Sequence, residues 1–209
     1  MKKFPDDSRI SNSFPLFVDL IYIGILWLLC SLPIVSIGPA SAAMYYATVK
    51  SVRRGRGHAG REFFAALKEN FKNGIKLWLM FLGLILLWGA NLYFGGIARG
   101  DAGPGISAFL IIPVLLPLPW GFAYISRFDN SFWDTVKFSV LLSLKNLPRT
   151  IMLLLILAAF VILGWLFPAL IPLLPGLCCL LMSLQTEPVF RAITQELETD
   201  ENQDKWYNE

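Results

Sequence analysis

Long apolar stretches recur along the whole chain and are separated by shorter polar and basic segments. Since a helix needs about 20 apolar residues to cross a bilayer, within roughly 17–25, these stretches predict six spans. They cover residues 17–34, 35–52, 75–97, 105–125, 151–167 and 169–186. We therefore expect an all-α, polytopic transmembrane helix bundle of three hairpins. It forms one membrane domain, residues 17–192, between a cytoplasmic segment, 1–16, and an acidic tail, 193–209.

The second predicted span, residues 35–52, is short and rich in small residues. Gly, Ala and Ser predominate between Gly38 and Ala43, and such residues suit close approach between helix backbones better than contact with lipid. A full crossing and a re-entrant segment are both open for this stretch.

The distribution of basic residues decides between these two arrangements. Lys and Arg in short loops favour the cytoplasmic side of a membrane. With six spans and the N-terminus inside, 17 of the 18 Lys and Arg residues fall on that side, and Arg99 alone falls outside. Without a crossing at 35–52, the cluster of Arg53, Arg54 and Arg56 would face outward. The charges therefore predict six crossings of the cell membrane, with both termini in the cytoplasm.

Two stretches between the spans, residues 60–73 and 131–147, have the pattern of amphipathic helices at the cytoplasmic membrane interface or under the bundle. Ser131 and Asp134 have the spacing of a capping box at the start of the second helix. In both helices apolar residues recur every four positions: Phe63, Leu67 and Phe71 in the first, and Phe132, Val136, Val140 and Leu144 in the second.

The junctions that follow these two helices repeat. Residues 70–75 (NFKNGI) align with residues 146–151 (NLPRTI), and each begins with Asn, contains a basic residue and leads into a span. We expect Asn70 and Asn146 to cap the preceding helices, with the basic residue, Arg149 in the second copy, at a lipid phosphate. A binding site at these positions is the alternative.

Three stretches are distinctive: LLCSLPIVSIG at 28–38, FFAALKENFK at 63–72 and LKNLPRT at 144–150. They resemble the YesL family of bacterial integral membrane proteins, a family of unknown function, and the resemblance extends from about residue 19 to residue 191. Members are often encoded beside genes for carbohydrate ABC transporters and sensor kinases. The resemblance therefore implies an accessory role in sugar uptake or sensing, with components of those systems as partners. It implies no catalytic residue.

Composition agrees with a lipid environment. The chain is 56% hydrophobic and 16% charged, with a mean hydropathy of +0.58, whereas soluble domains have about 45–50% apolar and about 25% charged residues. Cys30, Cys178 and Cys179 all lie within apolar stretches and lack metal-ligand spacing, so we expect them to be packing residues.

Few polar side chains fall within the predicted spans. Asp19 is a candidate for function because an ionisable group inside a membrane is costly. Its place near the start of a helix also suits the helix dipole. We expect Asn91 to hydrogen-bond to another helix. Glu187 is expected to meet water or pair with Arg191, and Arg127 to anchor the fourth span at the lipid headgroups.

No residue set indicates an enzyme, a cofactor or a metal site. His58 is the single histidine and has no Cys or carboxylate cluster around it in the sequence. The basic cluster of Arg53, Arg54 and Arg56 contains no nucleotide-binding motif. We expect it to contact anionic lipid and not nucleic acid.

Two functions therefore follow as expectations. The first is a non-catalytic integral membrane protein that is an accessory component linked to carbohydrate uptake or sensing. The second is a small-molecule or lipid transporter or channel, since broken helices often line transport sites. The residues that could break the fourth span are Pro113, Pro117 and Pro119.

Overall fold

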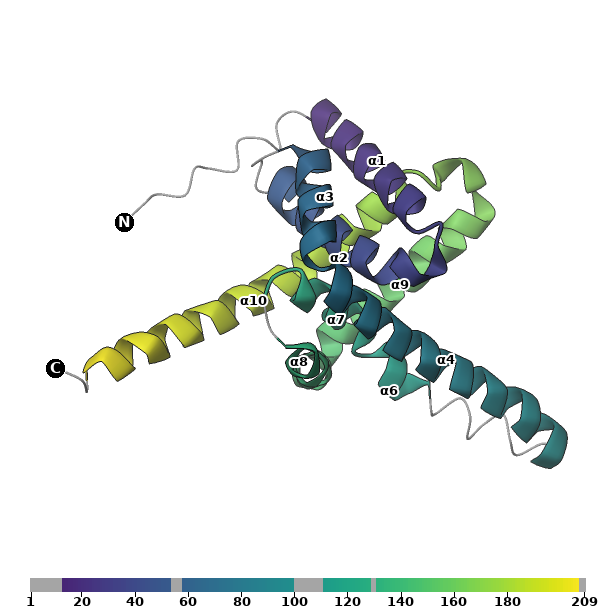
Figure 1. The fold of residues 1–209 in the computed structure, drawn as a ribbon. Coiled ribbons are helices and arrows are strands. Elements are labelled where there is room, and N and C mark those ends of the chain that lie inside the picture. The colour runs from purple at the N-terminus through teal and green to yellow at the C-terminus, as the bar shows by residue number, and fades with distance from the viewer. Residues whose placement is uncertain (1–12, 54–57, 100–110, 129–130, 207–209) are drawn as a thin grey trace.

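The computed structural model describes residues 13–53, 58–99, 111–128 and 131–206, and throughout these ranges the ordered elements are helices (Figure 1). This confirms the all-α class. The longer elements are α1 (Ser13–Cys30), α2 (Ile37–Ala47), α3 (Ala59–Glu69), α4 (Phe71–Arg99), α6 (Ile112–Leu115), α7 (Leu118–Ile125), α8 (Phe132–Lys145), α9 (Leu147–Leu166) and α10 (Leu174–Trp206). Single turns of 3₁₀-helix lie at Ile34–Ser36 and Pro168–Leu170, and a π-helical turn, Thr48–Arg53, continues α2.

Two of the predicted spans have the length and hydropathy of membrane helices. They are Phe71–Phe94 within α4 and Leu147–Leu166, which is α9, while Leu16–Cys30 is a shorter apolar helix. Only 11% of the residues in each of the two long apolar windows are buried inside the molecule. Most of their apolar side chains therefore face outward, as expected of helices whose surroundings are lipid.

The short helix α2 lies at the centre of the bundle. It contacts α1, α3, α4, α7 and α10, and Ala40, Ala42 and Ala43 are completely buried. The small side chains of α2 allow five helices to pack closely around it. The prediction that this stretch suits helix packing better than lipid contact is confirmed.

Two glycines set the distance between α2 and α4. A Cβ atom on Gly38 would collide with the carbonyl oxygen of Gly74 and with Cβ of Trp78, and a Cβ on Gly74 would lie 2.8 Å from Cα of Pro39. The two backbones are therefore in direct contact, in the manner of small-residue interfaces between membrane helices.

The fourth predicted span is broken. Residues 105–110 lie outside the described residues, but α6 ends at Leu115 and α7 starts at Leu118, with a turn at Leu116 and Pro117 between them. Proline lacks the N–H that would continue the helix and clashes with the preceding turn. The break expected from the prolines of this span is confirmed at Pro117.

The sixth helix differs from the predicted limits at both ends. It begins at Leu174, after the turn at Pro168–Leu170, and Pro175 occupies its first turn, where a missing N–H costs nothing. It then continues past residue 186, through Pro188, to Trp206. The stretch predicted as a tail is rich in Glu and Gln, which are good helix formers, and it projects from the bundle as helix (Figure 1).

The two amphipathic helices are present as α3 and α8. Both end at an asparagine whose side-chain amide donates to the carbonyl four residues earlier: Asn70 to Ala66 at 3.1 Å and Asn146 to Leu142 at 3.3 Å. The expected C-caps and the repeat between the two junctions are therefore confirmed. Phe71 belongs to α4 and not to α3.

The apolar stripe of α8 is divided between the bundle and the surface. Phe132 and Val136 pack against the core, while Val140 and Leu144 are exposed. The buried face of the helix also carries Thr135, Ser139 and Ser143, whose hydroxyl groups bond to carbonyl groups at most four residues away. Exposed apolar residues of this kind suit a helix at the membrane interface. Ser131 is the N-cap of α8 but forms no side-chain capping bond, so the expected capping box does not form.

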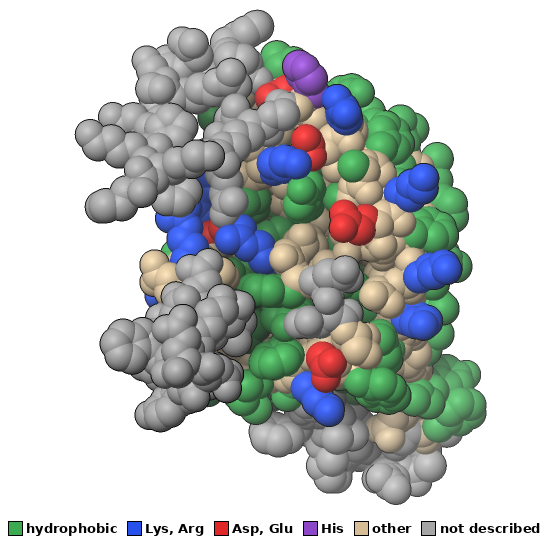
Figure 2. Space-filling view, turned by 60° about the vertical axis from the view of Figure 1, so that its left-hand side comes forward, with side chains coloured by type: hydrophobic (Ala, Val, Ile, Leu, Met, Phe, Trp, Pro, Cys, Tyr) green, Lys and Arg blue, Asp and Glu red, His purple; other side chains and the backbone are tan. Residues whose placement is uncertain are grey.

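On the face drawn in Figure 2, Lys and Arg side chains lie across the middle of the surface with Asp and Glu side chains between them. Hydrophobic side chains form the right-hand edge of this view. On this face, charged side chains therefore border an apolar edge.

Candidate functional site

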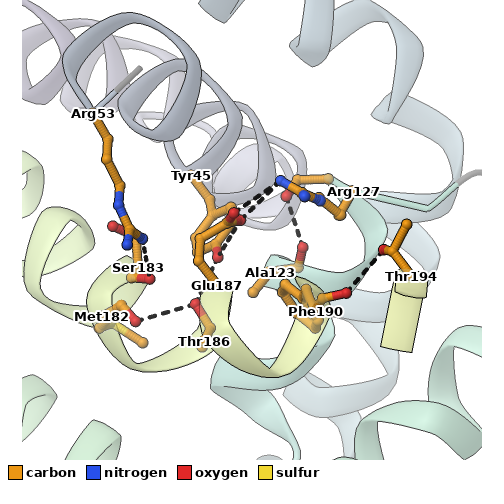
Figure 3. Close-up of polar contacts among 11 residues, drawn as sticks. Tyr45, Arg53, Ala123, Arg127, Met182, Ser183, Thr186, Glu187, Phe190 and Thr194 are labelled. Carbon is orange, nitrogen blue, oxygen red and sulfur yellow. Dashed lines mark hydrogen bonds and ion pairs between the residues drawn. The ribbon is translucent and has the colours of Figure 1, made fainter. Parts of the chain in front are cut away.

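Three segments far apart in the sequence meet at one buried polar cluster (Figure 3). They are the π-helical turn after α2, the end of α7 and the middle of α10. A π-helical turn accommodates an extra residue and often occurs at functional sites. Here it reorients the last residues of the segment, among them Lys50 and Arg53.

An ion pair forms the centre of the cluster. Glu187 is completely buried, and Nη1 of Arg127 lies 3.1 Å from its Oε1 and 3.0 Å from its Oε2. The Arg127 side chain is 23% exposed. A carboxylate removed from water without a partner carries a penalty of several kcal/mol, so this arginine is what allows the charge to be buried in α10.

Tyr45 links α2 to the same cluster. Its hydroxyl oxygen lies 2.6 Å from Oγ1 of Thr186 and 3.4 Å from Oε1 of Glu187. Because the Thr186 hydroxyl donates its proton to the carbonyl of Met182, at 3.1 Å, Tyr45 is the donor in the short bond to Thr186. The hydroxyl of Tyr45 is thus held against α10, beside the ion pair.

Two further basic side chains border the cluster. Nζ of Lys50 lies 2.6 Å from Oε2 of Glu62 in α3 and donates to the hydroxyl of Tyr46 at 3.1 Å. Arg53 donates from Nη1 to the carbonyl of Ser183 at 2.8 Å. The π-helical turn is therefore tied to α3 on one side and to α10 on the other.

Aromatic packing holds α7 and α10 in register around the ion pair. The ring of Phe190 is completely buried and packs edge to face against Trp120, Tyr124 and Phe128, with centroids 5.7 to 6.4 Å apart. Such contacts add directional packing to the hydrophobic contribution. They fix the helix that carries Glu187 against the helix that leads to Arg127.

Two hollows adjoin the cluster and share the side chain of Tyr45. We call them the polar pocket, of about 260 Å³, and the apolar cavity, of about 300 Å³. The polar pocket is lined by Tyr45, Tyr46, Val49, Lys50, Ser126, Arg127 and Glu187. The apolar cavity lies between α1, α2, α4, α7, α9 and α10, and its walls include Trp27, Tyr45, Phe122, Phe160, Val161 and Cys178.

Among the predicted site residues that the structure describes, Glu187 alone lines these hollows. Its expected contact with water is wrong, because the carboxylate is completely buried and paired with Arg127. Arg127 is likewise directed to this partner and not simply to lipid headgroups. The physical reason is that α10 continues as helix beyond the predicted end of the span, which keeps Glu187 inside the bundle.

The other predicted polar positions lie elsewhere. Asp19 is half-buried in α1, Asn91 is exposed on α4 and Arg149 is exposed in the first turn of α9. Asn70 and Asn146 are the helix caps already described. Of the basic cluster expected to contact anionic lipid, Arg53 bonds to Ser183, whereas Arg54 and Arg56 lie outside the described residues.

The residues that the sequence prediction did not select are Tyr45, Lys50 and Thr186. A signal for them was present, since the predicted topology places the ends of the second, fourth and sixth spans on one side, and these ends carry charges of both signs. Within the described ranges, no group of three or more His, Cys, Asp and Glu side chains is placed to hold a metal ion. The cluster can instead donate hydrogen bonds to an acceptor in the polar pocket.

Comparison with known proteins gives a match to one family model, over part of the chain. Residues 20–92 match a family described as "Protein of unknown function, DUF624", which is the YesL-type domain. The match covers α2 and the π-helical turn, with Tyr45 and Lys50, and ends before Arg127 and Glu187. No curated protein and no solved structure matched the chain.

Proposed function

We propose that this chain is an integral protein of the cell membrane with six crossings and both termini in the cytoplasm. The meeting of Lys50, Arg127 and Glu187 supports this topology. These residues end the second, fourth and sixth predicted spans, and a chain that crosses in pairs brings those three ends to the same side. A cluster of charged groups at that level would lie where side chains can reach water and headgroups.

We further propose a non-catalytic role, as an accessory component of a carbohydrate uptake or sensing assembly. The observation that carries this proposal is the pairing of the charged groups: Arg127 with Glu187, and Lys50 with Glu62. A general acid, base or nucleophile must reach a reacting atom, whereas these side chains tie α2, α3, α7 and α10 together. The resemblance to the YesL family supports the link to ABC transporters and sensor kinases.

The helix α3 is the part of the predicted cytoplasmic surface best suited to a partner. It exposes Phe64 beside Arg61 and Lys68, while Phe63 and Ala66 anchor it to the bundle. Aromatic and Arg side chains are the residues most enriched at protein interfaces.

The test is site-specific photo-crosslinking in native membranes, with the crosslinking amino acid at Phe64. A matched control carries it at Tyr93, which is also exposed, at 67% against 52% for Phe64, but lies on the predicted outer half of α4. We expect ABC-transporter or sensor-kinase components to be captured from position 64 only, and deletion of the gene to slow uptake of the sugar that the captured transporter carries. Capture of neither class, together with unchanged uptake, contradicts the accessory role.

A transporter or channel is the second candidate, and the break at Pro117 favours it. The helix α7, which follows the break, contributes Leu118 and Pro119 to the apolar cavity and leads to Ser126 and Arg127 in the polar pocket. Broken helices beside a central site are typical of transporters.

Lipid transport is tested with vesicles that contain the purified protein and a fluorescent phosphatidylglycerol, bleached from outside by dithionite. Transport between leaflets predicts bleaching well beyond the outer-leaflet share, and slower bleaching for Pro117→Ala. Bleaching that stops at the outer-leaflet share, as in protein-free vesicles, contradicts lipid transport.

A further inference from the structure

We propose that the polar pocket and the apolar cavity form a single binding site for one phospholipid molecule. Its phosphate lies at Lys50 and Arg127, and one acyl chain enters the bundle. This inference rests on the proposal that the chain is an integral membrane protein, but not on the side of the membrane that its loops occupy, the accessory role or the transport role.

Tyr45 lies between the two hollows, which are therefore adjacent. Its side chain lines both of them, and its hydroxyl group is held by Thr186 and Glu187. On one side of this residue the walls are charged, and on the other side they are apolar over nearly their whole surface. A ligand that fills both hollows must therefore be an amphiphile.

The apolar cavity reaches the outer surface of the bundle at α9. Val161 lines the cavity and is nevertheless 67% exposed, so the wall at this residue is open to the surroundings. Because α9 has the length and hydropathy of a membrane helix, the opening faces the acyl chains of the bilayer. A lipid chain can enter there without passing through water.

The polar pocket supplies hydrogen-bond donors. Both contacts of Arg127 with Glu187 use Nη1, and a guanidinium group carries five N–H donors. Lys50 has three donors and uses two acceptors, on Glu62 and Tyr46. The remaining donors suit an acceptor-rich group, and charge-assisted bonds to a phosphate are among the strongest hydrogen bonds.

The ion pairs indicate how much negative charge the ligand carries. Because Lys50 and Arg127 are each paired with a carboxylate, the pocket offers hydrogen-bond donors but little net positive charge. A free multivalent anion would be held weakly there. A phosphodiester carries a single negative charge, and its attached chain gains further binding from the apolar cavity.

The ligand class is tested by native mass spectrometry of the full chain in a mild maltoside detergent. The probes are dioleoyl-phosphatidylglycerol, dioleoyl-phosphatidylethanolamine, dioleoylglycerol and inorganic phosphate. Since both hollows must be filled, we expect one molecule of either phospholipid to bind about tenfold more tightly than dioleoylglycerol, and inorganic phosphate not to displace it. Equal binding of dioleoylglycerol, or displacement by phosphate, overturns the proposal.

Two pairs of variants locate the site. Val161→Trp should block the opening and lower the bound phospholipid several-fold, whereas Ile162→Trp, at a neighbouring residue that is 60% exposed and does not line the cavity, should not. Lys50→Gln should weaken phospholipid binding and leave dioleoylglycerol binding unchanged, and Lys76→Gln, exposed on α4, is its control.

Val161, Ile162 and Lys76 are exposed, and glutamine at position 50 keeps a hydrogen-bond donor where Lys50 contacts Glu62, so folding is expected to survive. Thermal melting of each variant in detergent verifies this. If Val161→Trp and Ile162→Trp bind phospholipid equally well, or if Lys50→Gln and Lys76→Gln do, any bound lipid lies elsewhere. Either result overturns the proposed site. The outcome is independent of which side of the membrane the loops occupy, which is measured separately by cysteine labelling.

Discussion

Glu187 carries a charge in a place that water does not reach. Its carboxylate is acceptable there because Nη1 of Arg127 lies within 3.1 Å of both oxygens. Replacing such a pair by apolar residues of similar volume is often neutral, whereas removing one partner is strongly destabilising. The pair therefore specifies which helices meet more than it adds to stability.

Breaking the pair from either side should lower the free energy of unfolding. We expect Arg127→Met and Glu187→Leu each to cost about 3 kcal/mol, the lower end for a buried pair because Arg127 is partly exposed. The double variant Arg127→Met/Glu187→Leu should lose much less than the sum. Denaturant unfolding in detergent micelles measures the free energy of unfolding of the wild type, the two single variants and the double variant, which together form a double-mutant cycle.

Glu69→Gln is the control for this cycle, because Glu69 is exposed at the end of α3, and it should change stability by less than about 0.5 kcal/mol. Strictly additive losses in the double variant would mean that Arg127 and Glu187 stabilise the fold independently of one another.

At the scale of elements, α2 is a short helix that other helices surround. Its contact with α4 depends on Gly38 and Gly74, whose lack of side chains brings the two backbones together. On α4 itself, Gly83 has open space where a Cβ would lie. Glycine is therefore required for helix packing at positions 38 and 74 but not at position 83.

Because Gly38 is in close contact and Gly83 is not, replacing each by alanine is expected to change the stability of the protein in opposite directions. Gly38→Ala should destabilise the protein by about 1–3 kcal/mol, because the added methyl group meets the backbone of α4 and the helices must separate. Gly83→Ala should be neutral or stabilising by up to about 1 kcal/mol, because alanine is the better helix former. Thermal melting in detergent compares them, and a loss of stability for both substitutions would argue against the close contact.

The elements also show a repeated design at the ends of α3 and α8. In each case Asn caps the amphipathic helix, and its carbonyl accepts the first bond of the next helix, from Gly74 at 2.7 Å and from Thr150 at 2.9 Å. The second copy is more strongly anchored, because the Thr150 hydroxyl also accepts a bond from the buried Trp120 at 2.9 Å. One local motif therefore attaches two amphipathic helices to two long apolar helices.

At the scale of the whole molecule, the apolar surface and the polar cluster occupy different parts of the bundle. The long apolar helices α4 and α9 are mostly exposed along their length, while Lys50, Arg127 and Glu187 gather where three segments end. In the proposed topology this places the cluster at the cytoplasmic surface and the apolar helices in lipid.

Cysteine labelling tests the topology directly. In a background with Cys30, Cys178 and Cys179 replaced by Ala, we expect Leu32→Cys to react with a membrane-impermeant maleimide on intact cells. His58→Cys should react only after permeabilisation. Both positions are exposed, so access to solvent does not distinguish them. Labelling of position 58 from outside would reverse the arrangement.

The sequence by itself determined where most of the helices lie, that prolines could break the fourth span, and where α3 and α8 are capped. Each of these properties depends on neighbouring residues: a run of apolar side chains, a proline without an N–H, or an amide four residues from a carbonyl. It also indicated that the small residues of α2 belong inside a bundle.

Only the tertiary structure decided which side chains meet. Tyr45 and Thr186 are 141 positions apart, and Arg127 and Glu187 are 60 apart. Their pairing depends on the rotation of each helix about its axis and on how far α10 continues, as does the inward-facing polar side of α8. These are properties of helices packed against one another, and a local pattern of apolar and polar residues does not specify them.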